Sequence, residues 1–264
     1  VPVSGVIGGP VSGWILQNMA GIMGYAAWQW LLLIEAIPAV LMGILVLTYL
    51  KDGIDTANWL SETEKDILQR RIQADNEDKE DYTFGQLLFN SRIWRCALIY
   101  FCYVMGLYGV GFWLPTIIKA MGVAGTFNIG LLSAIPSAVA IIGMVLVSTS
   151  SDRHRERRWH VAIPAFFGAV WLIFSVVFSD NTWLAMTALS LASFGIMTTF
   201  PLFWSLPTAY LRGAAAATGI AFINSFGNLS GFVSPYMIGL IKDATNSTDA
   251  GMYVLAGFLV VGAL

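Results

Sequence analysis

Long apolar stretches alternate with short polar ones along the chain. A helix needs about 20 apolar residues to cross a hydrocarbon core of about 30 Å. Backbone groups in lipid must be satisfied inside the segment, so recurring stretches of this length predict helices. The pattern therefore predicts an all-α protein, a polytopic membrane helical bundle whose first and last segments are shorter than a full span. The eight segments are Val1–Leu16, Trp28–Leu50, Cys96–Leu114, Ile129–Thr149, Val161–Phe178, Trp183–Leu206, Ala214–Ile238 and Met252–Leu264.

One long polar stretch, residues 51–91, interrupts this pattern. Within "LSETEKDILQRRIQ", Ser61 stands three residues before Glu64, which is the spacing of a capping box. We predict a short amphipathic surface helix there, without chemistry of its own, followed by solvated chain in "ADNEDKED". Two spans, a linker and six spans become a regular six-plus-six plan if four spans precede the chain. The expected parts are therefore residues 1–50, the last two helices of a first half-bundle, the linker 51–91, and a second half-bundle at 92–264.

Basic residues gather in loops that lie on one side of the bundle by parity. Twelve of the fourteen are there, and only Lys119 and Lys242 fall on the other side. Loops rich in Lys and Arg remain in the cytoplasm, so we expect residues 51–91 and 151–160 to be cytoplasmic. The twelve are Lys51, Lys65, Arg70, Arg71, Lys79, Arg92, Arg95, Arg153, Arg155, Arg157, Arg158 and Arg212.

Composition agrees with a membrane protein. The 264 residues are 57% hydrophobic and 11% charged, whereas about a quarter of a soluble chain is charged. The mean hydropathy is +0.70. The chain opens at Val1 without an initiator Met and stops at Leu264 inside an apolar segment, so we expect a fragment of a longer protein.

Several stretches resemble the major facilitator superfamily, over the fifth to twelfth of its twelve helices. "SDRHRERRWH" resembles the second-half copy of its Asp-Arg…Arg-Arg loop, and "GVIGGPVSG" resembles the Gly-Pro motif of its fifth helix. "WQWLLLIEAIPAVLMGILVLTYLKD", "FWLPTIIK" and "LPTAYLRGAAAATGIAFINSFGNLSGFVSPY" resemble the bacterial anion:cation symporter family. Two departures, Ser148 and Arg155 where the family has Gly, put the geometry of the loop's turn in doubt.

The resemblance implies a monomeric symporter of the bacterial inner membrane. Such a protein imports a small organic anion, such as an aromatic acid, tartrate or a sugar acid, together with a proton. We expect no cofactor, no metal and no nucleic-acid partner, and the lipid bilayer as the surroundings. In the family, the anion-binding Arg and the proton-carrying acids belong to the first four helices. The segments seen here would supply the polar and aromatic wall of the site.

The arginine-rich loop is the expected gate. The resemblance implies that Asp152 and Arg153, with Arg157 and Arg158, pair with neighbouring helix ends when the transporter faces outward. They would release when it faces inward, as a two-state charge contact at a helix terminus. The alternative is that these charges serve topology and solvation only.

Small residues follow one face of the first segment. Gly5, Gly9 and Gly13 recur every four residues, with Pro10 beside them. This spacing permits close helix approach. The resemblance implies that this face packs against the fourth segment, across the interface between the two half-bundles.

Two amides mark the seventh segment. Asn224 and Asn228 are four residues apart, so they share one helix face. Amides are costly in lipid and face a partner helix or a wet cavity. The alternatives are interhelical hydrogen bonding, worth around 1 kcal/mol, and substrate contact, since related symporters place a substrate-contacting Asn on this helix.

Other residues are candidates for substrate contact, and each also has a structural interpretation. Trp204 and Ser205 match a pair that lines the family's cavity, although a Trp at the end of a span is also a common interface anchor. Tyr100 and Tyr103 could offer hydroxyls to a substrate or pack as buried aromatics. Glu35, the only acid within a complete span, could make a structural hydrogen bond or handle protons.

Functions other than symport would need different residues. A membrane-embedded enzyme would need paired acids, a His cluster or an activated nucleophile inside the bundle. Both histidines lie in one loop and no span holds two acids, so we expect no enzymatic activity. A transporter-like sensor or scaffold would need an extra soluble domain. Within transporters, the main alternative is a facilitator or antiporter for sugars or drugs.

Overall fold

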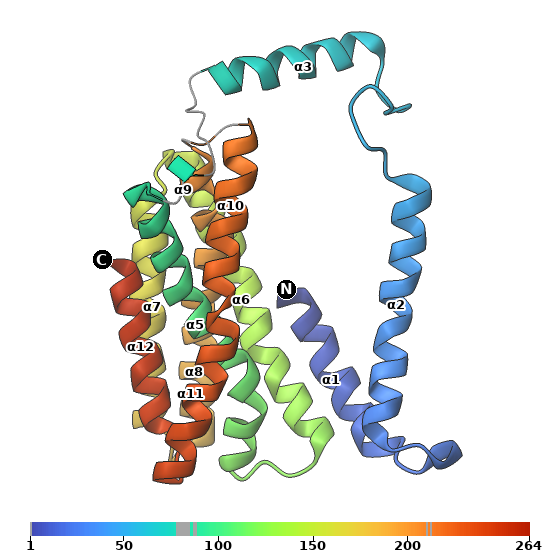
Figure 1. Ribbon diagram of the computed structural model, residues 1–264. Coiled ribbons are helices and arrows are strands. Elements are labelled where there is room, and N and C mark those ends of the chain that lie inside the picture. The colour runs from blue at the N-terminus through green and yellow to red at the C-terminus, as the bar shows by residue number, and fades with distance from the viewer. Residues whose placement is uncertain (1, 78–84, 87–88, 210, 212) are drawn as a thin grey trace.

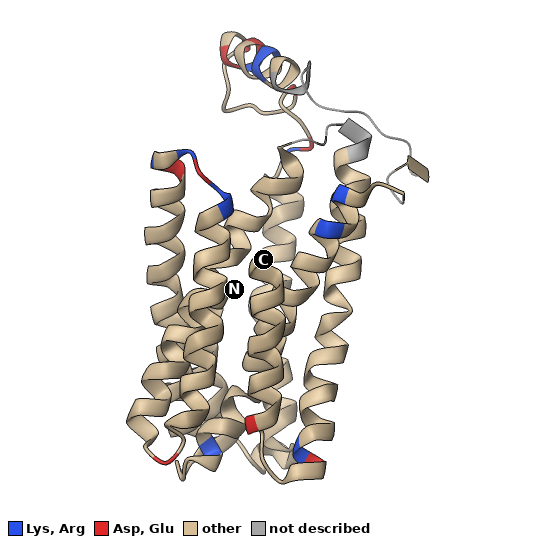
Figure 2. Ribbon diagram, turned by 90° about the vertical axis from the view of Figure 1, so that its left-hand side faces the viewer, with Lys and Arg blue, Asp and Glu red and all other residues tan. Residues whose placement is uncertain are grey.

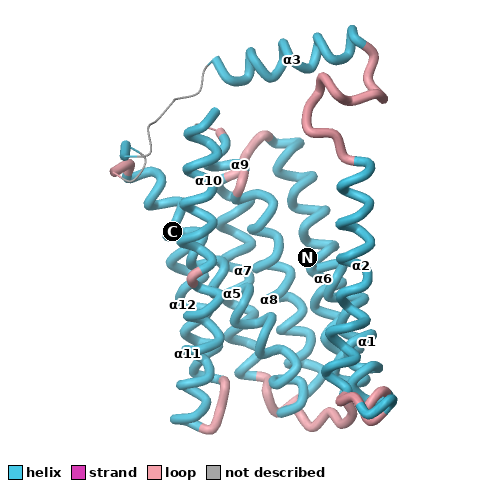
Figure 3. The backbone as a smooth tube through the Cα atoms, turned by 45° about the vertical axis from the view of Figure 1, so that its right-hand side comes forward, coloured by secondary structure: helices cyan, strands magenta, loops and turns pink. Residues whose placement is uncertain are grey.

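The protein is all helix in the part of the chain that the structure describes. The computed structural model describes residues 2–77, 85–86, 89–209, 211 and 213–264. Helices and the loops that connect them make up this part (Figure 3). The predicted fold class is therefore confirmed. The elements are α1 (Pro2–Asn18), a 3₁₀ turn (Ile22–Gly24), α2 (Ala27–Tyr49), α3 (Glu62–Glu77), α5 (Ser91–Ala120), α6 (Thr126–His154), α7 (Arg158–Val177), α8 (Thr182–Phe203), α9 (Ser205–Thr208), α10 (Gly213–Asn228), α11 (Ser230–Thr245) and α12 (Asp249–Ala263).

Helices α5 to α12 pack side by side as one bundle, and α1 joins it through α6 (Figure 1). Helix α2 contacts α1, and none of its side chains is buried. Helix α3 lies across the end of the molecule between α2 and the bundle (Figure 1). The buried core comes mainly from α5, α7, α8 and α12. The molecule thus has a well-packed bundle with α1 and α2 attached along one side.

Within the described residues, five helical segments are long and apolar enough to cross a membrane. Their outward surface is apolar too, as in α2, where Leu47 is 86% exposed. Such a surface suits hydrocarbon, in which exposed leucine costs nothing. The protein is a multi-pass membrane protein. The five segments are Ala27–Tyr49, Ser91–Ala120, Thr126–His154, Arg158–Val177 and Thr182–Thr208.

The seventh predicted segment is helical on both sides of Leu229, which itself keeps right-handed helical dihedrals (φ −58°, ψ −29°). The sequence predicts a single span over Ala214–Ile238, whereas the structure divides it into α10 and α11 at Leu229. Around this point the N–H of Leu229 donates to the carbonyl of Phe226, three residues back. The hydroxyl of Ser230 donates to the carbonyl of Gly227 at 2.5 Å. Side-chain hydroxyls that bond to helix carbonyls compete with the backbone N–H groups and can tighten or interrupt the helix. The length of an apolar segment does not reveal this local effect.

The linker helix is present where the capping box predicts it. The N–H and hydroxyl of Ser61 donate to the Glu64 carboxylate at 2.9 and 2.7 Å. These bonds hold the pKa of the Glu64 carboxyl below its usual range. Helix α3 runs on to Glu77, so the first part of "ADNEDKED" is helical rather than solvated chain. An acidic, polar stretch can extend a capped helix when no glycine or proline stops it.

Charged residues of the bundle gather near the two ends of its helices (Figure 2). This is the distribution that a bilayer imposes, because charge at mid-depth is costly. Two of the twelve basic residues that predict sidedness, Lys79 and Arg212, lie outside the described residues.

Candidate functional site

The glycine face of α1 lies directly on α6. A Cβ at Gly9 would lie 2.7 Å from the carbonyl oxygen of Gly130, and one at Gly13 would lie 2.6 Å from that of Thr126. Gly5 is similarly blocked by a serine hydroxyl of α6. The Thr126 hydroxyl donates to the carbonyl of Gly13 at 3.2 Å. Only residues without a side chain allow the two backbones to approach this closely. Pro10 lies inside α1, partly buried.

Two cavities adjoin this contact. One, of about 270 Å³, lies between α1, α5, α6 and α8 and includes several hydroxyl groups in its wall. A second, of about 390 Å³, shares Gly9, Pro115 and Ser133 with the first and includes Lys119. The hydroxyl-bearing residues of the first are Ser4, Ser133, Ser137 and Ser193.

A chain of four polar side chains joins α5 to α10. The Tyr100 hydroxyl lies 3.5 Å from Oδ1 of Asn224, and the side-chain N–H of Asn228 donates to the same oxygen at 2.9 Å. The Tyr108 hydroxyl donates to Oδ1 of Asn228 at 3.1 Å. We call these residues, Tyr100, Asn224, Asn228 and Tyr108, the Tyr–Asn ladder. Both amides are exposed. Tyr108 was missed from the sequence, although it follows Tyr100 by about two helical turns.

Aromatic rings support one end of the Tyr–Asn ladder. The Tyr100 ring stacks on Phe203 with centroids 5.0 Å apart, and it lies 4.8 Å from the ring of Trp204. Trp204, the residue after α8, is half-buried. The structure therefore brings Trp204 against Tyr100, at one end of the Tyr–Asn ladder.

Two other candidates are not brought to the ladder. The Tyr103 hydroxyl donates to the carbonyl of Gly262 at 2.7 Å, and the residue is 2% exposed. Tyr103 thus packs α5 on α12. The Ser205 hydroxyl donates to the carbonyl of Leu202 at 2.6 Å, inside its own chain segment. Both hydroxyl protons are already used by protein carbonyls, which favours packing roles.

The turn between α6 and α7 is closed by its own charges. Asp152 pairs with Arg157 at 2.5 Å, and Arg157 also donates to the Ser151 hydroxyl at 2.9 Å. Among the described residues, Asp152 thus pairs with the N-cap residue of the next helix, α7, and an exchange of this partner during transport stays a prediction. The reason is proximity, since Arg157 is only five residues away across a tight turn. Arg153 and Arg158 are exposed.

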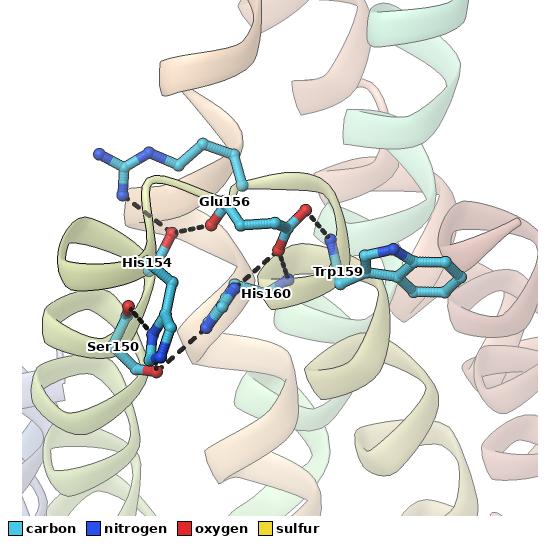
Figure 4. Close-up of polar contacts among 7 residues, drawn as sticks. Ser150, His154, Glu156, Trp159 and His160 are labelled. Atoms are coloured by element: carbon cyan, nitrogen blue, oxygen red, sulfur yellow. Dashed lines mark hydrogen bonds and ion pairs between the residues drawn. The ribbon is translucent and has the colours of Figure 1, made fainter.

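Glu156 organises the start of α7 (Figure 4). Its carboxylate accepts from the backbone N–H of Trp159 at 2.8 Å and of His160 at 3.2 Å, and it pairs with Nδ1 of His160 at 2.8 Å. The N–H of Trp159 is the main cause that lowers the pKa of the Glu156 carboxyl. Nε2 of His160 lies 3.1 Å from the Ser150 hydroxyl (Figure 4). This is N-capping by an acid, a signal that was present in the sequence and was not used there.

Sequence comparison identifies the family. Residues 1–235 match the family model described as Major Facilitator Superfamily. The chain belongs to the major facilitator superfamily. It is 42% identical to the "Putative metabolite transport protein NicT" of Pseudomonas putida over 99% of its length, and 44% identical to a "Putative tartrate transporter" of Agrobacterium vitis over its whole length. It is also 35% identical, again over its whole length, to the "Quinolone resistance transporter" of Acinetobacter baumannii. The chain spans 60% of the first two proteins and 61% of the third.

One acid of this superfamily member links α1 to α2. The Ser12 hydroxyl donates to Oε1 of Glu35 in a short hydrogen bond. The Glu35 side chain is exposed. This contact favours the structural role weighed for Glu35, because it ties together two helices that otherwise share few contacts.

Arg155 occupies a backbone conformation that suits glycine better than arginine. It ends α6 with φ 53° and ψ 31°, the left-handed conformation. The turn is therefore kept despite the departure from the family pattern. An L side chain costs about 1–2 kcal/mol there, and glycine avoids that cost.

Arg155→Gly is therefore expected to stabilise the protein by about 1 kcal/mol, measured as a higher midpoint of thermal unfolding in detergent. Arg158→Gly removes the same charge at the first residue of α7, where the backbone is helical, and should not stabilise. Equal shifts for the two variants would mean that charge, and not backbone conformation, decides the effect.

Proposed function

We propose that the protein is a secondary active transporter that imports a small organic anion with a proton by alternating access. The observation that carries this proposal is the Tyr–Asn ladder. Exposed amides on a membrane-embedded helix need a polar partner or a wet cavity, and amide N–H groups suit a carboxylate or hydroxyl acceptor. The names of relatives as metabolite and tartrate transporters support the same substrate class.

In this proposal, residues 1–50 and 92–264 belong to two half-bundles that rock against each other around the site. The glycine contact of α1 with α6 is the interface between them. The linker and residues 151–160 are cytoplasmic, and the membrane is the bacterial inner membrane. The protein works as a monomer. The Tyr–Asn ladder and Trp204 form one wall of the site, which the first half-bundle completes with a cation and proton-carrying acids.

A second candidate is drug or sugar antiport. The relative named for quinolone resistance supports it, and the rings of Tyr100, Phe203 and Trp204 would suit a flat aromatic solute. The two candidates differ in the direction in which a proton gradient moves the solute.

Uptake into proteoliposomes decides between them. The complete reading frame that contains this chain would be purified and tested with labelled tartrate, a sugar acid and an aromatic carboxylate. Symport predicts accumulation of one of these above equilibrium when the gradient runs inward, and collapse on addition of a protonophore. Accumulation against that direction, or no dependence on the gradient, would overturn symport.

The gate has its own test. We propose that Asp152 exchanges Arg157 for a neighbouring helix end when the transporter faces the other way, with Arg153 and Arg158 assisting. Asp152→Asn should then lower uptake at least tenfold while expression and the midpoint of thermal unfolding stay near those of the parent. Asp180→Asn, in the turn between α7 and α8, is the matched control. Equal losses of uptake in both variants would mean that Asp152 serves only membrane topology and not gating.

A further inference from the structure

An apolar groove opens below the α6–α7 turn, on the outer face of the bundle. Its volume is about 220 Å³. Trp159 and Ile163 border it and are 60% and 62% exposed, so the groove faces the surroundings of the protein and not its core. It is lined by Val147, Trp159, Ile163, Pro164, Phe167 and Phe194, with one edge of His160.

Three arginines of the α6–α7 turn and the start of α7 have no acidic partner among the described residues. Asp152 is taken by Arg157, and Glu156 by His160. Arg153, Arg155 and Arg158 are left, all of them exposed. The turn therefore presents about three uncompensated positive charges. The Arg158 guanidinium lies 5.8 Å from the centroid of the Trp159 ring, which connects this charge directly to the groove.

His160 lines the groove, but neither of its ring nitrogens is free to bind a ligand there. Its Nδ1 is paired with Glu156 and its Nε2 lies within 3.1 Å of the Ser150 hydroxyl. Both nitrogens are thus engaged inside the turn. Any anion at this place would be met by the arginines, and any hydrocarbon by the ring faces below them.

The length of α7 from Arg158 to the far end of the groove matches a lipid that stands upright in a leaflet. A helix rises 1.5 Å per residue, so Phe167 lies about 13 Å along α7 from Arg158. That is the distance from a headgroup phosphate into the upper acyl chain, in a leaflet whose hydrocarbon half is about 15 Å thick. Aromatic rings at the ends of spans occupy this boundary in membrane proteins.

We propose that this groove is a binding site for one anionic phospholipid of the adjoining leaflet. The phosphate of the lipid lies among Arg153, Arg155 and Arg158, and the upper part of one acyl chain fills the groove beside Ile163. The site is separate from the Tyr–Asn ladder and does not depend on which solute is carried or in which direction.

Native mass spectrometry of the complete protein, titrated with phosphatidylglycerol and with phosphatidylcholine of identical chains, tests this. The parent should retain phosphatidylglycerol at least tenfold more tightly. A basic residue near an anionic surface contributes about fivefold in affinity, or about 1 kcal/mol. Arg155→Gln/Arg158→Gln should therefore weaken phosphatidylglycerol about twentyfold and leave phosphatidylcholine unchanged. Ile163→Trp, which fills the groove without changing charge, should weaken both lipids.

Arg92→Gln/Arg95→Gln is the matched control. It removes two exposed arginines from the first turns of α5, outside the groove, and should leave the preference for phosphatidylglycerol within twofold of the parent. Equal loss in the two double variants would overturn the proposal, because net charge alone would then explain binding. Equal retention of both lipids by the parent, or no effect of Ile163→Trp, would overturn it as well. A thermal melt of each variant verifies that it is folded before the titration.

Discussion

Gly9→Ala is expected to push α1 away from α6 and to lower transport more than tenfold. The new Cβ would lie 2.7 Å from the carbonyl oxygen of Gly130, and that oxygen belongs to a helix backbone that cannot turn aside. Overpacking of this kind costs about 1–3 kcal/mol. In a protein of this size the midpoint of thermal unfolding should fall by roughly 2–10 °C. Uptake should fall more than tenfold, since the proposed interface between the half-bundles would no longer close.

The neighbouring glycine supplies the control. A Cβ at Gly8 would meet no atom within 4 Å, so Gly8→Ala makes the same chemical change on another face of α1. It should leave thermal unfolding and uptake close to those of the parent. If Gly8→Ala and Gly9→Ala change thermal unfolding and uptake equally, helix propensity would explain both changes. The close contact of Gly9 with α6 would then not be their cause.

Asn224→Ala is expected to raise the apparent KM for the organic anion about ten- to hundredfold. Asn224 stands at the centre of the Tyr–Asn ladder, where its Oδ1 accepts from both Tyr100 and Asn228. Its own side-chain N–H group is a donor for a carboxylate. One hydrogen bond to a charged group contributes about 1.5–3 kcal/mol, which corresponds to that change in affinity. Concentration-dependent uptake into proteoliposomes measures it.

Two further variants separate binding from packing. Ser225→Ala, one residue along the same helix and likewise exposed, should leave the KM unchanged. Tyr108→Phe removes only the donor to Asn228 and should raise the KM by less than Asn224→Ala. A lower midpoint of thermal unfolding in Asn224→Ala with an unchanged KM would show that the ladder serves only to hold α5 against α10.

The sequence by itself determined the class of the protein and where most of its helices lie. Apolar length predicts spans because transfer into hydrocarbon depends on the composition of a window of residues and not on its neighbours in space. The α3 cap is equally local, since Ser61 and Glu64 bond to each other across one turn. The spacing of Gly5, Gly9 and Gly13 likewise marked a face for close packing, and the resemblance implied the fourth segment as its partner.

Only the tertiary structure decided which side chains form hydrogen bonds and ion pairs with one another. Tyr108 and Asn228 are 120 residues apart, and Tyr103 and Gly262 are 159 apart, so no local pattern contains these pairs. The choice of Arg157 by Asp152 depends on the shape of the α6–α7 turn, which an exposed arginine in the left-handed conformation completes. Hydrogen bonds and ion pairs act over about 3–4 Å. They are therefore settled by which backbones pack together, while the preference of a segment for the membrane is settled by the residues of that segment.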